Sequence, residues 1–320
     1  DFCLSRGLGD VYKRQPFVWG VNVSISPDNQ SGKPCENLIY TVTIRNEGNV
    51  FDNYSLTVID NENWTLTLSE NSIIIAAGAS ENVTLIVKIP CKAFAGRGDN
   101  ITVTVYGTGV ENSATVIASV GIVRGVDVSI SPSYQENLPG ENLVYIVTVT
   151  NLGNIADNYN LSFSQTQDWE VLFWFTFINL PPYSSAQSEL IVIIPEVAVP
   201  GTQDNVTVKA VSKTDNTVTD SDSCIAQAKI VRGVEVSISP ENLVGHLGEN
   251  LTYTITITNT GNVDENYVLT IVDSENWGPT LSENILTVPA GSQNTATLSV
   301  VVPSNAYGWT EDNITITATS

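Results

Sequence analysis

Apolar and polar residues alternate along most of this chain with a period of two. In residues 40–44, 145–149 and 253–257, Tyr, Val and Ile take every second position and Thr takes most of the positions between them. Because successive side chains of a strand point to opposite faces of a sheet, this alternation predicts strands with one buried face. No stretch shows the 3.6-residue period of an amphipathic helix. Further strands are expected at residues 82–89, 101–105, 207–211, 295–301 and 314–318.

The alternation belongs to a pattern that occurs three times. Each copy opens with a VxVSISP run that ends at Pro27, Pro132 or Pro240, so the copies start 105 and 108 residues apart. Each then has a Tyr at +13, the Gly of an Asn-x-Gly-Asn turn at +21, a Tyr at +27, a Trp at +37 and an Asp-Asn pair ending at +73. Units of this length, with turn residues every 8 to 12 positions, predict three tandem Ig-like β-sandwiches of about seven strands each. We expect a positive φ at the Gly of each turn, and core or edge packing for each Trp.

The repeat also predicts how the chain is divided. Residues 5–15, SRGLGDVYKRQ, back-translate to a sequence that resembles a transposase adapter used in sequencing libraries, so residues 1–15 are interpreted as a non-native scar. Residues 16–19 are interpreted as the remnant of a preceding unit, and both termini as edges of a longer protein. The predicted units are residues 20–124, 125–232 and 233–320, and the third is expected to lack a final strand equivalent to residues 114–123.

The joints between the predicted units are short. At residues 114–126 the last strand of one unit runs into the first strand of the next with scarcely two residues between them. This is unlike a flexible Gly/Ser linker. At a rise of roughly 3.3 Å per residue, three such units end to end predict a semi-rigid rod on the order of 100 Å long.

The motifs also resemble known modules. Tyr-Thr-Val-Thr-Ile at 40–44, the Asn-x-Gly-Asn turn, Asn-Tyr-x-Leu-x-Val at 53–58, Asn63-Trp64, Ala77-Gly78 and Val-x-Ile-Pro at 87–90 resemble two Ig-like families. One family accompanies some glycoside hydrolases, and the other comprises cell-adhesion-related (CARDB-like) modules of archaeal and bacterial surface proteins. The resemblance implies a secreted spacer or adhesion role. The second unit departs from it, with Pro182-Tyr183 in place of Ala-Gly.

Charge and residue content exclude several functions. The 34 acidic residues outnumber the 13 basic ones and give a net charge of −21, which disfavours binding to nucleic acids and anionic membranes. No apolar run reaches the 18 residues expected of a membrane span. The single histidine, His246, is expected in a surface loop, and no catalytic triad can be assembled from the sequence. We therefore predict a non-enzymatic protein without a cofactor.

Calcium binding is a weaker alternative to this expectation. Carboxylates provide the oxygen ligands that Ca²⁺ prefers, but their spacing here is not that of an EF-hand. The other interpretation of these side chains is solubilising surface charge. The candidates are Asp60, Glu62, Asp273 and Glu275 beside the Trp turns, and Asp215, Asp220 and Asp222 in a longer hairpin of the second unit.

Covalent modification is predicted at two kinds of site. Cys35 and Cys91 occur together in the first unit only, so they either form a disulfide or remain separate thiols. Asn-x-Ser/Thr triplets predict N-glycosylation, although a chain rich in Asn, Ser and Thr also forms such triplets by chance. The triplets begin at Asn22, Asn29, Asn53, Asn63, Asn82, Asn100, Asn160, Asn205, Asn250 and Asn313.

One aromatic cluster distinguishes the second unit. Phe173-Trp174-Phe175-Thr176-Phe177 replaces a polar turn of the other two units. Trp174 and Phe175 are predicted to form a patch that binds a glycan or a partner protein. The alternative is that Phe173 and Phe177 point inward and only Trp174 is exposed.

Taken together, these features predict a structural or adhesion segment of an exported cell-surface or cell-envelope protein, acting as a spacer rod. Its partners would be other surface proteins or glycans. Two alternatives remain open: an accessory region of a secreted glycoside hydrolase, either carbohydrate-binding or a linker, and a filament subunit whose third unit accepts a strand from a neighbour.

Overall fold

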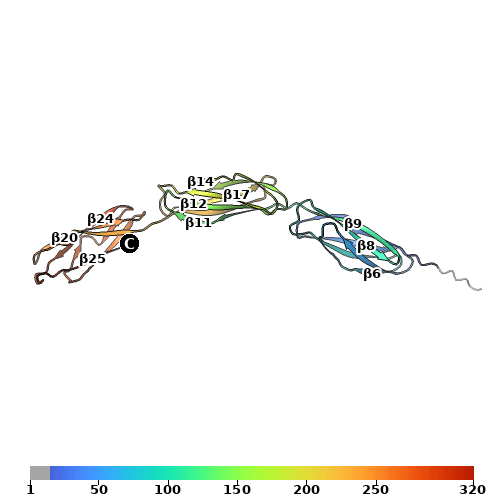
Figure 1. Cartoon of the computed structure of the whole chain (residues 1–320), viewed down its shortest axis with the longest axis horizontal. Coiled ribbons are helices and arrows are strands. Elements are labelled where there is room, and N and C mark those ends of the chain that lie inside the picture. The colour runs from blue at the N-terminus through green and yellow to red at the C-terminus, as the bar shows by residue number, and fades with distance from the viewer. Residues whose placement is uncertain (1–14) are drawn as a thin grey trace, which may run out of the picture.

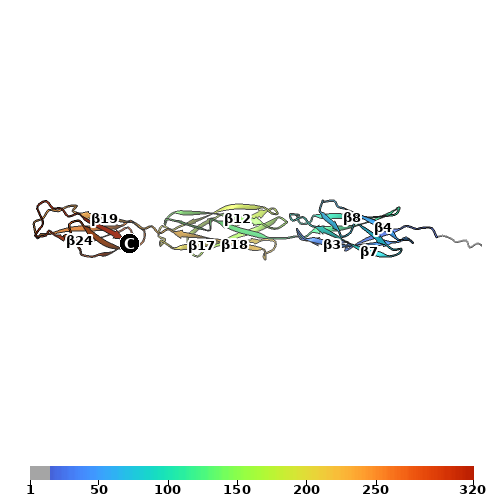
Figure 2. The same cartoon turned by 90° about the horizontal axis from the view of Figure 1, so that it is seen from below.

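The computed structural model describes residues 15–320 and contains three β-sandwiches that follow one another end to end in a slightly bent row (Figures 1 and 2). All regular elements in this range are strands. The all-β, Ig-like fold class predicted from the alternation is therefore confirmed. Residues 1–14, which hold most of the predicted adapter segment, lie outside the described residues.

The first unit consists of two sheets, in the orders β1-β3-β7-β5 and β2-β9-β8-β4-β6. All pairs are antiparallel except β2 with β9, which is parallel. Its strands are β1 (Val21–Ser26), β2 (Asn29–Gly32), β3 (Asn37–Asn46), β4 (Asp52–Ile59), β5 (Thr65–Leu68), β6 (Ser72–Ile75), β7 (Ser80–Lys88), β8 (Gly98–Gly107) and β9 (Val110–Val120).

The second unit repeats this arrangement strand for strand. Its sheets have the orders β10-β12-β16-β14 and β11-β18-β17-β13-β15, again with one parallel pair, β11 with β18. Its strands are β10 (Val126–Ser131), β11 (Tyr134–Asn137), β12 (Asn142–Asn151), β13 (Asp157–Ser164), β14 (Glu170–Phe173), β15 (Phe177–Leu180), β16 (Ser185–Ile193), β17 (Gln203–Ser212) and β18 (Thr219–Ala228).

The third unit contains fewer strands, in the sheet orders β19-β20-β24-β22 and β23-β21-β25. Residues 233–320 contain no strand equivalent to β9 or β18, which cover β1 and β10 in the other units. Val234 and Val236 are consequently each 37% exposed, whereas Val126 and Val128 are 8% and 5% exposed. Its strands are β19 (Val234–Ser239), β20 (Asn250–Asn259), β21 (Glu265–Asp273), β22 (Thr280–Leu281), β23 (Ile285–Val288), β24 (Gln293–Val301) and β25 (Ile314–Thr319).

The first two units have more strands than the seven expected. One reason lies at the anchor prolines. Pro27 and Pro132 each follow a strand of one sheet, and the chain then crosses to the other sheet as β2 or β11. Proline has no N–H to continue the ladder, so a stretch that looks like one strand in the sequence becomes two.

Each unit encloses its own hydrophobic core. The alternating residues of β3 point inward as predicted, and Tyr40, Val42 and Ile44 are fully buried between the two sheets. Trp64 is 8% exposed and belongs to the same cluster, which confirms a packing role for this Trp. The buried clusters contain residues 21–120, 126–228 and 251–316, respectively, and no cluster draws residues from two units.

Candidate functional site at the joints between units

The described residues offer little for catalysis or metal binding. His246 lies in an exposed loop, where its backbone N–H donates to Glu249. Within residues 15–320, no group of three or more His, Cys, Asp or Glu side chains is arranged to hold a metal ion. The same part of the chain has no helix long and apolar enough to cross a membrane.

Six of the seven carboxylates considered for calcium have structural partners. Asp220 and Asp222 on β18 accept hydrogen bonds from the backbone N–H groups of Val128 and Ile130 on β10, both at 2.7 Å. They therefore satisfy donors on a sheet edge. In the other acidic loops, three carboxylates accept hydrogen bonds from nearby backbone N–H groups: Asp60 from Trp64, Asp215 from Thr217, and Asp273 from Gly278. The carboxylate of Glu62 lies 3.7 Å from Arg97. Glu275 contributes only its backbone N–H, which donates to Asp312.

The first Asn of each Asn-x-Gly-Asn turn builds the turn from inside. Asn151 is fully buried, and its Oδ1 accepts a hydrogen bond from Gly153 N at 2.8 Å. Its Nδ2 donates to the carbonyls of Ile155 and Leu180 at 2.9 and 3.0 Å. A buried amide with this many partners fixes the backbone around it. Asn46 and Asn259 make the same contacts in the other units.

The Gly of this turn has a different role from the one predicted. None of Gly48, Gly153 and Gly261 has a positive φ, so the predicted left-handed conformation is wrong. A Cβ on Gly153 would instead lie 2.7 Å from the carbonyl oxygen of Val123 in the linker, and the corresponding distances are 2.5 Å at Gly48 and Gly261. Glycine is required here because the linker backbone approaches too closely for any side chain.

The second Asn of the turn holds the linker that enters the unit. Asn154 Oδ1 accepts from Val123 N, and its Nδ2 donates to Gly121 O, both at 2.8 Å. Its backbone N–H also donates to Val123 O at 3.0 Å. The amide side chain thus binds a donor and an acceptor of the linker at once. Asn49 binds Val18 and Pro16, and Asn262 binds Val231 and Lys229, in the same way.

The Tyr at +27 of each repeat makes a further contact with the linker. Tyr159 Oη donates to the carbonyl of Gly125 at 2.9 Å. Burial raises the pKa of Tyr159 to about 12, so the hydroxyl keeps its proton at neutral pH. Tyr54 and Tyr267 bind Gly20 and Gly233 at the same distance. We call the turn, its two Asn side chains and this Tyr the linker clamp.

A charged pair reinforces the clamp at the first joint. Arg124 in the linker lies 3.0 Å from the carboxylate of Asp157, the first residue of β13, and both side chains are largely buried. Burial alone would raise the pKa of Asp157, but hydrogen bonds from Ser212, Asn158 and Thr214, together with Arg124, outweigh it and lower the pKa. At the second joint Arg232 pairs with Glu265, but Arg232 is mostly exposed.

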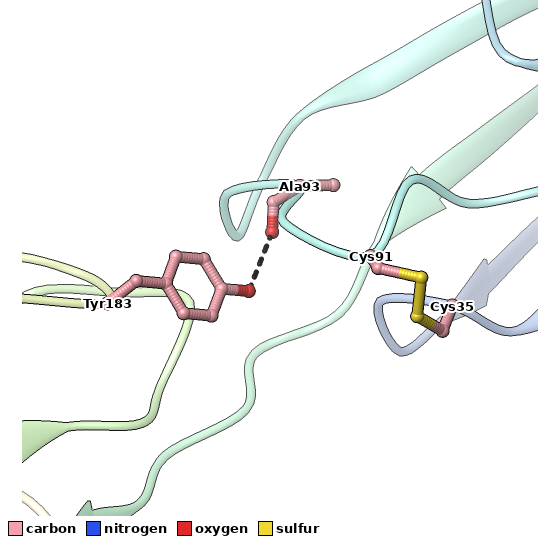
Figure 3. Close-up of a disulfide and its surroundings, with 4 residues drawn as sticks. All are labelled: Cys35, Cys91, Ala93 and Tyr183. Carbon is pink, nitrogen blue, oxygen red and sulfur yellow. Dashed lines mark hydrogen bonds between the residues drawn. A yellow bond between two sulfur atoms is a disulfide. The ribbon is translucent and has the colours of Figure 1, made fainter.

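The first joint has contacts that reach from one unit to the next, beyond the linker. Residues 90–97 form a loop at the end of the first unit, and Ala95 N donates to Asn154 O at 3.0 Å. Tyr183 of the second unit donates through its hydroxyl to Ala93 O at 3.4 Å (Figure 3). The ring centroid of Tyr183 also lies 6.3 Å from that of Phe94. These contacts fix the direction of the second unit relative to the first.

The same loop is tied back to its own unit. Cys91 and Cys35 form a disulfide, which Figure 3 shows beside the contact between Ala93 and Tyr183. Cys91 stands two residues before Ala93. The bond joins the loop to residues 33–36 on the other side of the sandwich end. Cys224, in the second unit, is a buried free thiol whose pKa burial raises to about 12, which keeps it protonated and unreactive.

The second joint lacks the equivalents of these contacts. Pro200 stands at the position of Ala95 and has no N–H to donate, and Gly291 stands at the position of Tyr183. No hydrogen bond between the loop at residues 195–201 and the third unit is present. The hydrogen bonds and the ion pair that connect the second and third units all involve the linker: they are those of the linker clamp, the bond from Thr260 N to Gly233 O, and the pair of Arg232 with Glu265.

The structure places the predicted modification and binding residues as follows. Every Asn of the ten glycosylation triplets is exposed, because each lies on an outward strand position or in a loop. Trp174 is 64% exposed, but Phe175 packs against the core of the second unit together with Phe173, and it is Phe177 that is exposed. Trp174 and Phe175 therefore do not form the continuous surface patch that was predicted, because successive residues point to opposite sides of the chain.

The sequence analysis missed the reach of the clamp. The sequence pattern did not indicate that the turn Asn side chains and the +27 Tyr bind the linker. The available signal was the fixed spacing between the linker and these residues: Gly125 precedes Tyr159 by 34 residues, and the same interval separates Gly20 from Tyr54 and Gly233 from Tyr267. The Asp of the Asp-Asn pair was also unassigned. Asp99, Asp204 and Asp312 each accept two backbone N–H groups of the loop before the Trp.

A comparison with protein families finds one match. A family model described as "IG-like fold at C-terminal of FixG, putative oxidoreductase" matches residues 28–120. These residues lie within the first unit, and the match agrees with its Ig-like sandwich. It concerns neither of the two families that the motifs resemble, so that resemblance stays a prediction. No curated protein matches the chain.

Solved structures with a similar arrangement of strands are distant in sequence. A protein of unknown function from Porphyromonas gingivalis W83 is 13% identical, covers 64% of this chain and 99% of its own, and has a TM-score of 0.27. The extracellular cadherin domains 1–4 of protocadherin gamma B7 are 12% identical, with coverages of 93% and 76% and a TM-score of 0.33. The chaperone–tip adhesion subunit complex of Csu pili from Acinetobacter baumannii is 10% identical, with coverages of 64% and 98% and a TM-score of 0.24. Such similarity carries no information on function.

Proposed function

We propose that this chain is a non-enzymatic structural segment of an exported cell-surface protein, and that it holds what it is attached to at a fixed distance. The observation that carries the proposal is the linker clamp. A linker whose N–H and C=O groups are bound by Asn154 and Tyr159 cannot behave as a flexible tether. All three units use the same clamp, so several of the residues that recur in the repeat serve to bind the linker.

The surface is consistent with this role. The net charge of −21 and the predominantly Thr and Ser outer faces favour solubility and disfavour pairing between exposed strand edges. The exposed Asn residues of the glycosylation triplets would allow glycans to cover the rod without disturbing a core. An extracellular location and glycosylation are parts of the proposal.

Small-angle X-ray scattering of residues 16–320 tests the spacer role. We expect an extended particle whose maximum dimension is on the order of 100 Å, as three end-to-end sandwiches require. The dimension should change little between low and high salt, because hydrogen bonds rather than long-range charge repulsion hold the joints. A compact particle, or one that collapses when salt screens the acidic surface, would contradict the proposal.

A second candidate function is glycan binding through Trp174. The observation that favours it is the 64% exposure of this large aromatic side chain at an edge of the second unit. A glycan array with residues 16–320 and a Trp174→Ser variant separates the two functions. A spacer binds no glycan in either form, whereas a carbohydrate-binding accessory region loses its signal in the variant.

A further inference from the structure

Three residues of the described chain adopt a left-handed backbone conformation at positions where both other units have glycine. One is Trp309, with a φ of 70°, whose counterparts Gly96 and Gly201 have φ values of 78° and 88°. Cys35 has a φ of 69°, and its counterparts Gly140 and Gly248 have φ values of 87° and 80°. Tyr183 has a φ of 56°, and its counterparts Gly78 and Gly291 have φ values of 74° and 63°. A residue with a Cβ is less stable than glycine in this region. The side chain of Trp309, in the third unit, is fully exposed, whereas the side chains of Cys35 and Tyr183 make specific contacts.

Both side chains act at the same joint. The side chain of Cys35 forms the disulfide with Cys91, and that of Tyr183 contacts the loop that carries Cys91. The contacts form a continuous path from Cys35 through Cys91 and Ala93 to Tyr183, as Figure 3 shows. Cys35 and Tyr183 therefore lie at the two ends of one bridge between the first and second units.

The loop does not need the disulfide in order to form. In the first unit Cys35 N donates to Ile89 O, and in the second unit Gly140 N donates to Ile194 O, without a disulfide. The backbone path at the end of the sandwich is thus common to both units. The disulfide adds a covalent tether to a loop that already has its conformation, and it restricts how far that loop can move with the second unit.

We propose that the Cys35–Cys91 disulfide and Tyr183 together lock the first joint, that the second joint is a hinge, and that reduction of the disulfide converts the first joint into a second hinge. This inference rests on the proposed spacer function and assigns its regulation to one bond. A chain with one hinge points its ends in a restricted set of directions, and a chain with two hinges does not.

The switching step is a thiol–disulfide exchange with a dithiol. A thiolate of the dithiol attacks one cysteine sulfur, the bond between the two cysteine sulfurs breaks, and a mixed disulfide forms. The second thiol of the reagent then displaces the cysteine and closes a cyclic disulfide. The reagent is oxidised by two electrons, and Cys35 and Cys91 each leave as a thiol.

Single-molecule energy transfer measures the two joints separately. Dyes are attached to p-azidophenylalanine at the exposed positions of Glu81, Glu189 and Thr297, one in each unit, so that labelling does not use cysteine. In the oxidised protein we expect a narrow distance distribution between the first and second positions and a broad one between the second and third. A dithiol should broaden the first distribution to the width of the second and leave the second unchanged.

Matched variants use the residues of the other units. Cys35→Gly with Cys91→Ser gives the first unit the pair found in the third, and it should reproduce the reduced state without a reductant. Tyr183→Gly should broaden the first distribution while both cysteines stay oxidised. Cys224→Ser should not change the response to the dithiol, because that thiol is buried and unpaired.

Several outcomes contradict the lock. One is a first distribution that is as broad as the second in the oxidised protein. Another is a first distribution that stays narrow both after reduction and in the Tyr183→Gly variant. Amide hydrogen exchange of β3 and β7 shows whether the first unit remains folded when reduced. If it unfolds, the Tyr183→Gly variant, which leaves the first unit intact, decides the question. Failure of the spacer function itself would appear differently, as a short mean distance between Glu81 and Thr297 in every redox state.

Discussion

The two joints of this molecule have the same contacts between the linker and the downstream unit, but they differ in the contacts made by the upstream unit. At both joints the downstream unit holds the incoming linker with the same clamp, built by Asn154 and Tyr159 at the first joint and by Asn262 and Tyr267 at the second. At the first joint the upstream unit also reaches across, through Ala95. At the second joint Pro200 takes that position and no such contact forms.

This difference shows that position and orientation are controlled separately. The clamp fixes where the linker enters the next unit, and it recurs wherever the repeat recurs. The loop at the end of the upstream unit decides whether the units can also swing relative to one another, and its sequence varies from unit to unit. A tandem protein can therefore adjust the stiffness of each joint by changing one loop while the folds of the units remain the same.

The largest effect should come from removing the amide that builds the clamp. Asn151→Ala deletes the donor to Ile155 O and Leu180 O and the acceptor for Gly153 N, and it leaves buried backbone groups without partners. At about 1–3 kcal/mol per buried unsatisfied group, we expect the free energy of unfolding of the second unit to fall by about 4 kcal/mol. Chemical denaturation monitored by Trp fluorescence measures this. Asn259→Ala should weaken the third unit similarly, and a strong effect at one joint only would show that the clamp is not common to both.

The next largest difference in stability between the joints should come from removing the linker arginines of the two ion pairs. Arg124→Ala leaves the buried carboxylate of Asp157 without its cation, and breaking such a pair typically costs about 3 kcal/mol. Arg232→Ala removes a cation that is 60% exposed from the side chain of Glu265, which is 10% exposed, and should cost about 1–2 kcal/mol. Thermal unfolding of the two variants measures the two losses in stability and therefore their ratio. Equal losses would mean that burial at the first joint does not matter.

The same pair makes a prediction about pH. The pKa of Asp157 in the folded protein is lowered from 3.8, so the folded state favours the charged carboxylate. Its contribution to stability is complete above pH 3.8 and is lost as the pH falls through the lower folded value. Unfolding of the second unit measured between pH 5 and pH 2 should show this loss in the native protein. In Arg124→Ala the loss should be smaller and should be complete at a higher pH, because one of the groups that lowers the folded pKa of Asp157 is absent.

A smaller effect is expected from adding a methyl group to the clamp glycine. A Cβ on Gly153 would lie 2.7 Å from Val123 O and 3.1 Å from the Cα of Arg124, so the linker would have to move away from the turn. We expect Gly153→Ala to destabilise the second unit by about 2 kcal/mol, within the usual range for local overpacking. Gly109→Ala is a suitable contrast, because that glycine has a φ of 72° and open space around it. It should show a backbone penalty of about 1 kcal/mol and no change at the joint.

The sequence carried the fold well and the joints only in part. The period-2 alternation of residues 40–44 predicted which side chains are buried, because on a two-sheet sandwich burial depends mainly on the face of the strand. The threefold repeat predicted the tandem arrangement. The partners of Asn154 and Tyr159 could not be predicted, because they are backbone atoms of the linker. Residues of almost any type can supply a backbone N–H or C=O, so such a contact does not require a particular residue in the sequence.

The contacts across the first joint were hidden for a related reason. Tyr183 was noticed as a departure from the Ala-Gly of the other units, but nothing in the sequence indicates that it faces Ala93, ninety residues earlier. The glycines of the turn were assigned the wrong role because Asn-x-Gly-Asn usually indicates a positive φ. Here the requirement comes from the approach of another segment, which a local pattern does not report.

The last prediction introduces at the second joint the two groups that make contacts across the first joint. Pro200→Ala gives the counterpart of Ala95 a backbone N–H. Gly291→Tyr places a Tyr in a left-handed position, with a φ of 63°, that matches the one Tyr183 occupies with a φ of 56°. We expect the double variant to narrow the distance distribution between labels at Glu189 and Thr297 towards that of the first joint. The stability of the third unit should change by only about 1 kcal/mol, because the backbone penalty of Tyr opposes the new contacts.

Each single change should narrow the distribution less than the pair, since the two contacts are separate restraints on the orientation of the two units. Gly78→Tyr in the first unit is the control. It introduces the same backbone penalty beside the turn that binds residues 16 and 18, away from both joints, so it should narrow neither distribution. If the double variant leaves the second joint as broad as before, the stiffness of the first joint must come from its disulfide-tethered loop rather than from the two hydrogen bonds, and the comparison of the joints then depends on Cys35 and Cys91 alone.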